Sequence, residues 1–335
     1  MKLGNVEIGV GRRPFTIAEM SGNHNHSLTG ADALKLQTYT PDTMTIDCRE
    51  GEFFLQDKKS LWQGKSLYEL YGEAMTPWEW HQAIYDRCKQ KGILCFSTPF
   101  DETAVDFLEK LNTPFYKIAS FENAHFPLIR KVAALGKPTI ISLGMTTLQD
   151  IAELVDVYRS AGGKDLILLK CTSSYPARPE EANLLTIPNL RETFGVEVGL
   201  SDHTMGWTLP VVATTLGATV IEKHFTLRRA DGGVDSTFSL EPEEFTSLVK
   251  ETAVAAASLG KVNYGLTADE SRSLVFRRSV YIVKDVQKGE TFTTENLRII
   301  RPGMGLAPKY LDQLIGRKAR QNYKRGTAMD WSKVY

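Results

Sequence analysis

The sequence of 335 residues lacks several features that mark whole classes of protein. It has no apolar run long enough to cross a membrane, and the segment Met1-Lys-Leu-Gly lacks the apolar core of a signal peptide. Lysine plus arginine (40) equals aspartate plus glutamate (40), so the formal net charge is zero, which argues against bulk binding of nucleic acid. We therefore expect no membrane partner, no nucleic-acid partner and a cytoplasmic location.

Cysteine is also scarce, and its spacing gives no CxxC motif. The chain contains Cys48, Cys88, Cys95 and Cys171, which we interpret as reduced packing residues. Cys171 ends an apolar run and so could face a site. No histidine is obviously paired with it in the sequence, and we assign it a structural role.

What the sequence does contain is an ordinary globular composition with an uneven charge. Hydrophobic residues make up 42% and charged residues 24%, enough to build a full core. Residues 272–335 hold 14 basic and 5 acidic residues, which leaves 26 basic and 35 acidic residues for the rest of the chain. Two parts of opposite charge should attract each other, or one should place positive charge over an anionic ligand held by the other.

Strand-like apolar runs alternate with amphipathic stretches up to about residue 260, which predicts a (β/α)8 TIM barrel. The runs are Phe15–Ala18, Ala33–Leu36, Leu94–Ser97, Phe115–Ile118, Thr139–Ser142, Leu166–Leu169, Val196–Leu200 and Thr219–Ile221. The helical stretches are Trp78–Gln90, Ala104–Leu111, Phe126–Ala134, Leu148–Ala161, Ile187–Phe194, Leu209–Leu216 and Pro242–Leu259.

The first connection is short for parallel strands, which need a crossover of about a dozen residues or more. We expect a helix to be missing between Leu28 and Thr29, whose alpha carbons should then lie farther apart than the roughly 3.8 Å of a trans peptide. After the barrel, short strand-like runs and glycine turns indicate a small β-rich module. The predicted division is a barrel at residues 1–262, a linker at 263–275 and the module at 276–335.

Two histidines follow neighbouring predicted strands. His203 lies in Gly199-Leu-Ser-Asp-His-Thr204 and His224 in Val220-Ile-Glu-Lys-His-Phe225. The carboxyl ends of barrel strands meet at the active-site face, where two imidazoles can hold one divalent metal and leave positions open for water or substrate. The alternative is two histidines satisfied by local hydrogen bonds; the shared location favours the metal.

Lys35 and Lys117 also follow apolar strand residues. Two lysines on barrel strand ends can bind a dianion, and they also suit a Schiff-base aldolase. A surface lysine with a buried stem is the third reading of either residue. Serine and threonine hydroxyls, together with the histidine pair, favour the anion-binding site over the Schiff-base aldolase.

Seven motifs stand in this order along the chain: Ile17-Ala-Glu-Met-Ser-Gly-Asn-His-Asn25, Leu34-Lys-Leu-Gln-Thr-Tyr39, Phe96-Ser-Thr-Pro-Phe-Asp101, Tyr116-Lys-Ile-Ala-Ser-Phe-Glu122, Gly199-Leu-Ser-Asp-His-Thr204, Glu222-Lys-His-Phe-Thr-Leu227 and Phe238-Ser-Leu-Glu-Pro242. Together they resemble the sialic acid synthase family. Lys288-Gly-Glu290 and Arg301-Pro-Gly-Met-Gly305 resemble the C-terminal antifreeze-like (SAF) domain of that family.

Within the family, four segments are most similar to the branch that makes pseudaminic acid. They are Glu19–Asn25, Lys35–Asp42, Cys171–Pro176 and Asp231–Phe238. The N-acetylneuraminate and legionaminic acid branches are the alternatives. One departure is Arg228, which stands where the resemblance leads us to expect an acidic residue.

The resemblance implies that phosphoenolpyruvate condenses with the aldehyde of an open-chain amino sugar and that phosphate is released. It implies a divalent metal (Mn²⁺, Mg²⁺ or Co²⁺) on His203 and His224, which also count as catalytic together with Glu19 and the candidate base Glu122. The implied contacts of phosphoenolpyruvate are Lys35, Thr98, Lys117, Ser120, Ser142, Ser173 and Ser201. Those of the sugar are Glu19, Gln37, Tyr175, Asp235 and Arg301. Asp202 and Glu222 could orient the histidines.

The resemblance further implies a domain-swapped homodimer in which Arg301 reaches the sugar of the partner subunit. Gly303 and Gly305 would allow that turn a close approach, and the opposite charges of the two domains agree with it. Two other functions stay open on the residues alone: a Schiff-base aldolase, and an inactive barrel that carries a carbohydrate- or surface-binding module.

Overall fold

The structure is a computed structural model that describes residues 1–20, 31–56 and 63–335. The predicted gap between Leu28 and Thr29 lies outside the described residues. The chain divides into two compact units, Met1–Gly260 and Lys261–Tyr335, and each is described by itself.

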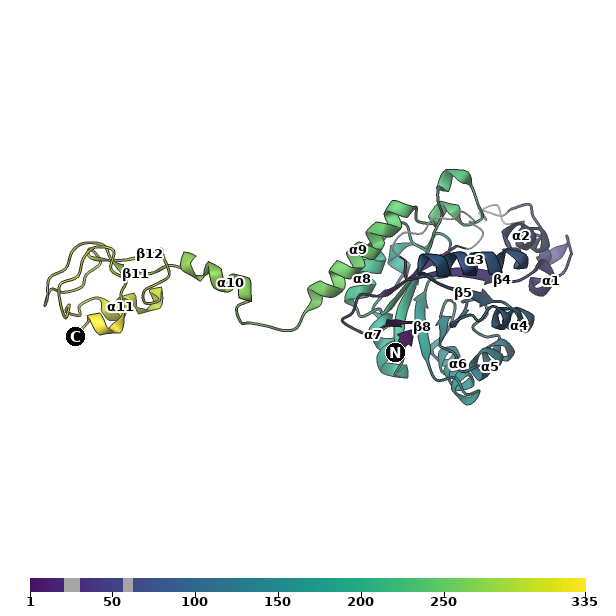
Figure 1. The fold of residues 1–335 in the computed structure, drawn as a ribbon, viewed down its shortest axis with the longest axis horizontal. Coiled ribbons are helices and arrows are strands. Elements are labelled where there is room, and N and C mark those ends of the chain that lie inside the picture. The colour runs from purple at the N-terminus through teal and green to yellow at the C-terminus, as the bar shows by residue number, and fades with distance from the viewer. Residues whose placement is uncertain (21–30, 57–62) are drawn as a thin grey trace. The chain divides into compact units, whose positions relative to one another are not determined.

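The first unit is a closed barrel of eight parallel strands in the order β10-β3-β4-β5-β6-β7-β8-β9, with helices around it (Figure 1). The strands are β3 (Phe15–Glu19), β4 (Ala33–Thr38), β5 (Leu94–Pro99), β6 (Tyr116–Ile118), β7 (Thr139–Ser142), β8 (Leu166–Cys171), β9 (Glu197–Asp202) and β10 (Val220–His224). The helices that follow strands are α3 (Trp78–Lys91), α4 (Glu102–Lys110), α5 (Phe126–Ala134), α6 (Leu148–Ser160), α7 (Thr186–Phe194), α8 (Thr208–Thr215) and α9 (Pro242–Leu259). The predicted barrel is confirmed, and each predicted run overlaps an observed strand.

Alternation along the strands sorts their side chains between the two faces of the sheet. On β10, Ile221 packs outward in the larger apolar cluster, which includes residues of the surrounding helices. Val220 points the other way and joins Phe15, Phe96, Phe115 and other residues in a second cluster inside the barrel. The barrel interior is therefore a packed core at the level where the strands begin.

Two or four residues further along each strand, toward its carboxyl end, the side chains that point into the barrel are polar. Each strand contributes one buried polar position to this level of the interior: Glu19, Lys35, Thr98, Lys117, Ser142, Cys171, Ser201 and Glu222. A ring of functional groups thus lies directly above the apolar core.

The amino end of the barrel is closed by a short hairpin that the sequence did not reveal. Strands β1 (Lys2–Leu3) and β2 (Val6–Glu7) pair in antiparallel fashion. Leu3 and Ile8 belong to the apolar cluster inside the barrel. Access to the interior is therefore left to the carboxyl end of the strands.

The connection from β4 to β5 is much longer than the others because it carries extra elements before α3. They are α1 (Pro41–Met44), a 3-10 turn at Gly51–Phe53 and α2 (Leu67–Ala74). Helix α2 begins in a capping box, in which the Ser66 hydroxyl accepts from the Glu69 amide and the Glu69 carboxylate accepts from the Ser66 amide. This insertion brings additional apolar side chains to the carboxyl end of the barrel.

The second unit has its own core. It begins with α10 (Ala268–Ser273), which lies in the segment expected to be a linker, and continues with β11 (Ser279–Ile282), β12 (Leu297–Ile300) and α11 (Leu311–Leu314). Strands β11 and β12 are antiparallel. Val280, Phe292 and Leu314 are completely buried in its apolar cluster. The expected small β-rich module is confirmed.

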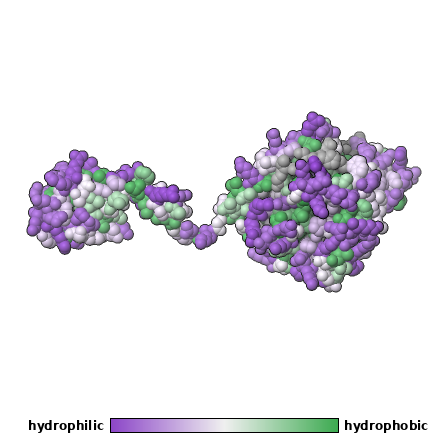
Figure 2. All heavy atoms as spheres, viewed as in Figure 1, coloured by the Kyte–Doolittle hydropathy of each residue, from purple (hydrophilic) through white to green (hydrophobic). Residues whose placement is uncertain are grey.

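The face of the molecule in Figure 2 is mostly hydrophilic, with apolar residues scattered over it. Among the residues that the structure describes, no helix combines the length and the apolar character needed to cross a membrane.

Candidate active site

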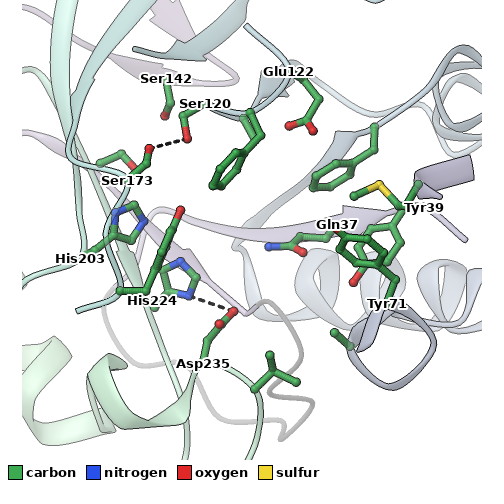
Figure 3. A pocket seen from close by; sticks show the side chains of 18 of the residues that line it. Gln37, Tyr39, Tyr71, Ser120, Glu122, Ser142, Ser173, His203, His224 and Asp235 are labelled. Atoms are coloured by element: carbon green, nitrogen blue, oxygen red, sulfur yellow. Dashed lines mark hydrogen bonds and ion pairs between the residues drawn. The ribbon is translucent and has the colours of Figure 1, made fainter. Parts of the chain in front are cut away.

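A cavity of about 450 Å³ opens at the carboxyl ends of the barrel strands (Figure 3). Its polar lining consists of Lys35, Gln37, Lys117, Ser120, Glu122, Ser142, Cys171, Ser173, Tyr175, Ser201, His203, Glu222, His224 and Asp235. The strands and the loops after them supply these side chains. The structure therefore brings together most of the residues that the sequence singled out.

Four buried charged groups form the floor of this cavity. The Lys35 ammonium forms ion pairs with Glu19 and, at 3.4 Å, with Oε1 of Glu222. The Lys117 ammonium lies 3.1 Å from the same Glu222 oxygen. Burial alone would raise the pKa of Glu222, but the two lysines outweigh it and hold that pKa at about 2. Glu222 is therefore ionised and fixes both lysines side by side.

Glu19 is buried beneath the cavity and is not among its lining residues. Its partners are Lys35 and the side-chain amide of Gln37, which donates to Glu19 Oε1 at 3.2 Å. Burial raises the pKa of the Glu19 carboxyl, and the nearby Glu222 charge adds to this. Glu19 therefore holds Lys35 and Gln37 in place, and its catalytic role stays a prediction.

The predicted hydroxyl donors lie around the two lysines. Ser120, Ser142, Ser173 and Ser201 line the cavity, and the Lys35 ammonium donates to the Thr98 hydroxyl at 3.3 Å. The Ser173 and Ser120 hydroxyls are hydrogen-bonded to each other at 2.8 Å, as Figure 3 shows. The buried Ser142 Oγ has no partner among the described residues. Two cations and free hydroxyl capacity are suited to an oxyanion ligand.

The rings of His203 and His224 lie side by side on one wall, with centroids 5.3 Å apart. Nδ1 of His203 donates to the Thr172 carbonyl at 3.0 Å, which leaves Nε2 for another partner. Nδ1 of His224 is buried without a hydrogen bond, 3.7 Å from the Asp235 carboxylate. Burial and the neighbouring cations lower the pKa of His224 well below its usual value, so its imidazole is neutral and can act as a ligand.

This arrangement fits a divalent metal. In His203 the hydrogen bond of Nδ1 to a carbonyl fixes the ring, as in many metal sites. In His224 the buried Nδ1 has no hydrogen-bond partner among the described residues. The residues that the structure describes contain no group of three or more His, Cys, Asp or Glu side chains able to hold a metal. The metal site on His203 and His224, with its other positions open to water and substrate, stays a prediction.

Asp202 and Glu222 do not have the orienting role that we considered. The Asp202 carboxylate bonds Lys223 and the Thr204 hydroxyl, and Glu222 bonds the lysines. The Thr172 carbonyl is what orients the ring of His203. That partner could not be identified in the sequence because any residue supplies a carbonyl.

Glu122, the predicted base, faces the cavity from the loop after β6, on the side away from the histidines (Figure 3). Its Oε2 is buried without a hydrogen-bond partner among the described residues. Burial raises the pKa of Glu122 to about 7, against the opposing effect of Lys117. A carboxylate that gains and releases a proton near neutrality has the properties of a general base.

Three of the predicted sugar contacts, Gln37, Tyr175 and Asp235, line the cavity. The Tyr175 ring packs on His203 with centroids 4.5 Å apart, and Asp235 lies beside His224. Gln37 extends between the histidines and Tyr71 (Figure 3). Arg301 is exposed on the second unit, and its predicted contact with the sugar stays untested.

The structure gives Gly303 and Gly305 a role inside their own unit. A Cβ at Gly303 would lie 2.6 Å from the Leu274 carbonyl oxygen, and one at Gly305 would lie 2.6 Å from that of Val280. Packing of the module itself therefore requires both glycines.

Two features of the cavity were missed in the sequence. Cys171 lines it, with Sγ 4.0 Å from His203 Nδ1, although no histidine was paired with it. The other is an apolar wall, defined as Met44, Leu55, Leu67, Leu70, Tyr71 and Ala74. These residues belong to the insertion after β4, where no motif marked them.

Comparison with known proteins agrees with this fold and site. Residues 25–264 match the model of the NeuB family and residues 277–334 that of the SAF domain. This chain belongs to the NeuB family. The resemblance to sialic acid synthases is thereby confirmed.

The chain is 42% identical to the pseudaminic acid synthase of Campylobacter jejuni, with 98% of each chain covered. It is 41% identical to the pseudaminic acid synthase of Helicobacter pylori, over 94% of this chain and 96% of the relative. Among solved structures, the N-acetylneuraminic acid synthetase of Leptospira borgpetersenii matches with a TM-score of 0.70 and 30% identity, covering 82% of this chain and 94% of that one.

Proposed function

We propose that this chain condenses phosphoenolpyruvate with 2,4-diacetamido-2,4,6-trideoxy-L-altrose to form pseudaminic acid and phosphate. The observation that carries the proposal is the pairing of Lys35 and Lys117 on one buried carboxylate, Glu222, within the same cavity as the histidine pair. Near-full-length similarity to pseudaminic acid synthases supports the choice of sugar.

The lysine end of the cavity would hold phosphoenolpyruvate. The ammonium groups of Lys35 and Lys117 compensate its negative charge, and Ser120, Ser142, Ser173 and Ser201 supply hydroxyl donors around it. The Thr98 hydroxyl, which accepts a hydrogen bond from the Lys35 ammonium, would help to hold that ammonium in place.

The sugar aldehyde would lie between this end and the histidines. The enol carbon, C3 of phosphoenolpyruvate, attacks the aldehyde carbon, and a new carbon–carbon bond forms. The positive charge left on C2 is captured by water. Collapse of this adduct breaks the bond between C2 and the phosphate oxygen, which leaves a ketone and free phosphate.

Glu122 is the residue that would take the proton of the attacking water. Its pKa of about 7 makes a useful fraction ionised at neutral pH. Tyr175, Gln37 and Asp235 would position the hydroxyl and acetamido groups of the sugar.

A divalent cation, Mn²⁺, Mg²⁺ or Co²⁺, would be held by His203 and His224 and would supply Lewis-acid polarisation of the aldehyde oxygen. The neutral state of His224 and the fixed ring of His203 support this assignment. Two nitrogen ligands do not select among these three ions, so the ion bound depends on which metal is available.

The proposed active form is a domain-swapped homodimer in the cytoplasm, with residues 1–262 as the barrel, 263–275 as the linker and 276–335 as the SAF domain. Large apolar side chains on the loops after β6, β7 and β9 are exposed, including Phe121, Met145 and Met205, and they support a covered rim in the assembly. Arg301 of one chain would complete the sugar site of the other.

The proposal is tested by phosphate release from phosphoenolpyruvate with a panel of sugars. The altrose sugar should give the highest kcat/KM. Release with N-acetylmannosamine alone would assign the chain to the neuraminate branch, and preference for the matching mannose isomer would indicate legionaminic acid synthesis. A Schiff-base aldolase would instead allow borohydride to trap substrate on a lysine; the ion pairs of both lysines and the family membership weigh against it.

A further inference from the structure

The cavity has two chemically distinct ends. The barrel strands and the loops after them supply charged and hydroxyl groups, whereas the insertion after β4 supplies the apolar wall. In Figure 3 Tyr39 and Tyr71 lie across the cavity from His203 and His224, with Gln37 between them. A ligand that reaches both ends must have a polar head and an apolar tail.

Part of the apolar wall is held by aromatic packing and by the capping of α2. Tyr39, only 2% exposed, packs edge-to-face on Tyr71 at 5.9 Å and on Phe100 at 5.0 Å between ring centroids. The Trp78 indole donates to the Tyr39 carbonyl at 3.0 Å, and the capping box at Ser66 fixes the start of α2. Because the wall cannot collapse easily, its shape can discriminate between ligands.

We propose that the apolar wall is the specificity determinant for a methyl group at C6 of the sugar. This rests on the proposed function, which requires the aldehyde carbon C1 to lie between phosphoenolpyruvate and the histidines. C6 is then the carbon farthest from the histidines, and Tyr71 of the wall lies across the cavity from them (Figure 3). The side chains of Met44, Leu55, Leu67 and Leu70 offer no hydrogen bond to a hydroxyl group there.

The size of the effect follows from the chemistry of the wall. A 6-hydroxyl would lose its water on entering and find no replacement partner among Met44, Leu55, Leu67 and Leu70. An apolar site rejects an added hydroxyl by roughly 10- to 100-fold and not by more, because part of the group can stay solvated. The wall therefore separates 6-deoxy sugars from 6-hydroxy sugars, while the polar end recognises the acetamido groups.

The test compares two substrates that differ only at C6: 2,4-diacetamido-2,4,6-trideoxy-L-altrose and its counterpart with a 6-hydroxyl. We expect the native enzyme to prefer the 6-deoxy sugar by at least about tenfold in kcat/KM. Met44→Gln and Leu67→Asn, each of which places a hydrogen-bonding amide on the wall, should reduce this preference about tenfold and leave the KM for phosphoenolpyruvate unchanged.

Met75→Gln is the matched control, because Met75 lies in the same insertion and is half-buried but does not line the cavity. It should keep the native preference. Melting temperatures and the thermal shift produced by phosphoenolpyruvate verify that each variant is folded and binds its first substrate. Two variants at separate positions keep the test decisive if one of them fails to fold.

An unchanged preference in both folded wall variants would overturn the inference, and so would a native enzyme that does not distinguish the two sugars. A change in tolerance of the N-acyl groups without a change at C6 would assign the wall to an acetamido methyl and also contradict it. Failure of the proposed function has a different signature, since the native enzyme would then release no phosphate with either sugar.

Discussion

Asp202 and Lys223 form a buried ion pair, with 2.6 Å between Asp202 Oδ2 and Lys223 Nζ, directly before the two histidines in the chain. They are register partners on β9 and β10, and Lys223 also donates to the Thr204 carbonyl. His203 follows the acid and His224 follows the lysine. This pair therefore fixes the spacing of the backbone that carries both proposed metal ligands.

Removing one partner should leave a buried charge without compensation. We expect Lys223→Met to lower the free energy of unfolding by roughly 3–5 kcal/mol and to weaken Mn²⁺ binding. The double variant Asp202→Asn with Lys223→Met should recover part of the stability but not the metal affinity. Urea denaturation and calorimetric titration of Mn²⁺ measure the two effects. A single variant as stable as the native protein would show that the pair does not hold β9 to β10.

The barrel could be predicted from the sequence because its strands are buried on both faces and therefore appear as continuous apolar runs. Strand β7, with Ile140 and Ile141, is an example. Most of the polar ring could be located because its members lie in or just after the carboxyl-terminal half of such a run. The hairpin at Leu3 was missed because its two-residue strands are too short to show periodicity. The apolar wall was missed because Leu55 and Leu67 meet only through tertiary structure.

The roles of individual charges were also beyond the sequence. Glu222 stands next to Lys223 in the chain but bonds Lys35 and Lys117, which come from other strands. Cys171 and His203 are likewise on different strands. Alternation shows which side chains share a face, but partners across the barrel depend on register, which is set by the whole closed sheet.

Glu122 should make stability depend on pH in an unusual direction. Its folded pKa of about 7 exceeds the roughly 4.3 of an unfolded glutamate, so its contribution to stability is fully present below about pH 4.3 and is lost as pH rises through 7. Above pH 7 the buried carboxylate costs on the order of 3 kcal/mol. Glu122→Gln should therefore raise the melting temperature at pH 8 and have much less effect at pH 4. Equal effects at both pH values would contradict the raised pKa.

The same group should control the rate. If Glu122 is the base, kcat should rise with pH through about 7, because only the carboxylate accepts a proton. Glu122→Gln should lower kcat by about 100-fold or more and leave the KM for phosphoenolpyruvate nearly unchanged. A variant that keeps both full rate and the native pH profile would exclude Glu122 as the base.

Metal affinity should respond to Cys171. Burial lowers the pKa of His203, but the contact with the Cys171 thiol outweighs this and raises it above the usual value. A histidine with a raised pKa is protonated at higher pH, so protons should compete with Mn²⁺ as pH falls, by about tenfold in affinity per pH unit below that pKa. Cys171→Ala should shift this loss to lower pH.

His203→Ala and His224→Ala should both weaken Mn²⁺ binding, and treatment with EDTA should abolish turnover.

Completion of the site by Arg301 of the partner chain can be tested by subunit exchange. Arg301→Ala and Glu122→Gln should each be nearly inactive alone. In a mixed dimer one site would carry both changes and the other neither, so exchange should restore up to about half of the native activity per mixed dimer. Mixtures that stay inactive after exchange has been demonstrated would mean that Arg301 does not act across the dimer.

The most direct test of the central claim is the fate of the bridging oxygen of phosphoenolpyruvate. The enzyme would be given phosphoenolpyruvate labelled with ¹⁸O between C2 and phosphorus, together with the 2,4-diacetamido altrose sugar, and both products would be analysed by mass spectrometry. Condensation with cleavage at carbon predicts phosphate that carries the label and a nine-carbon acid that does not. Unlabelled phosphate, or phosphate release without the nine-carbon acid, would contradict the account.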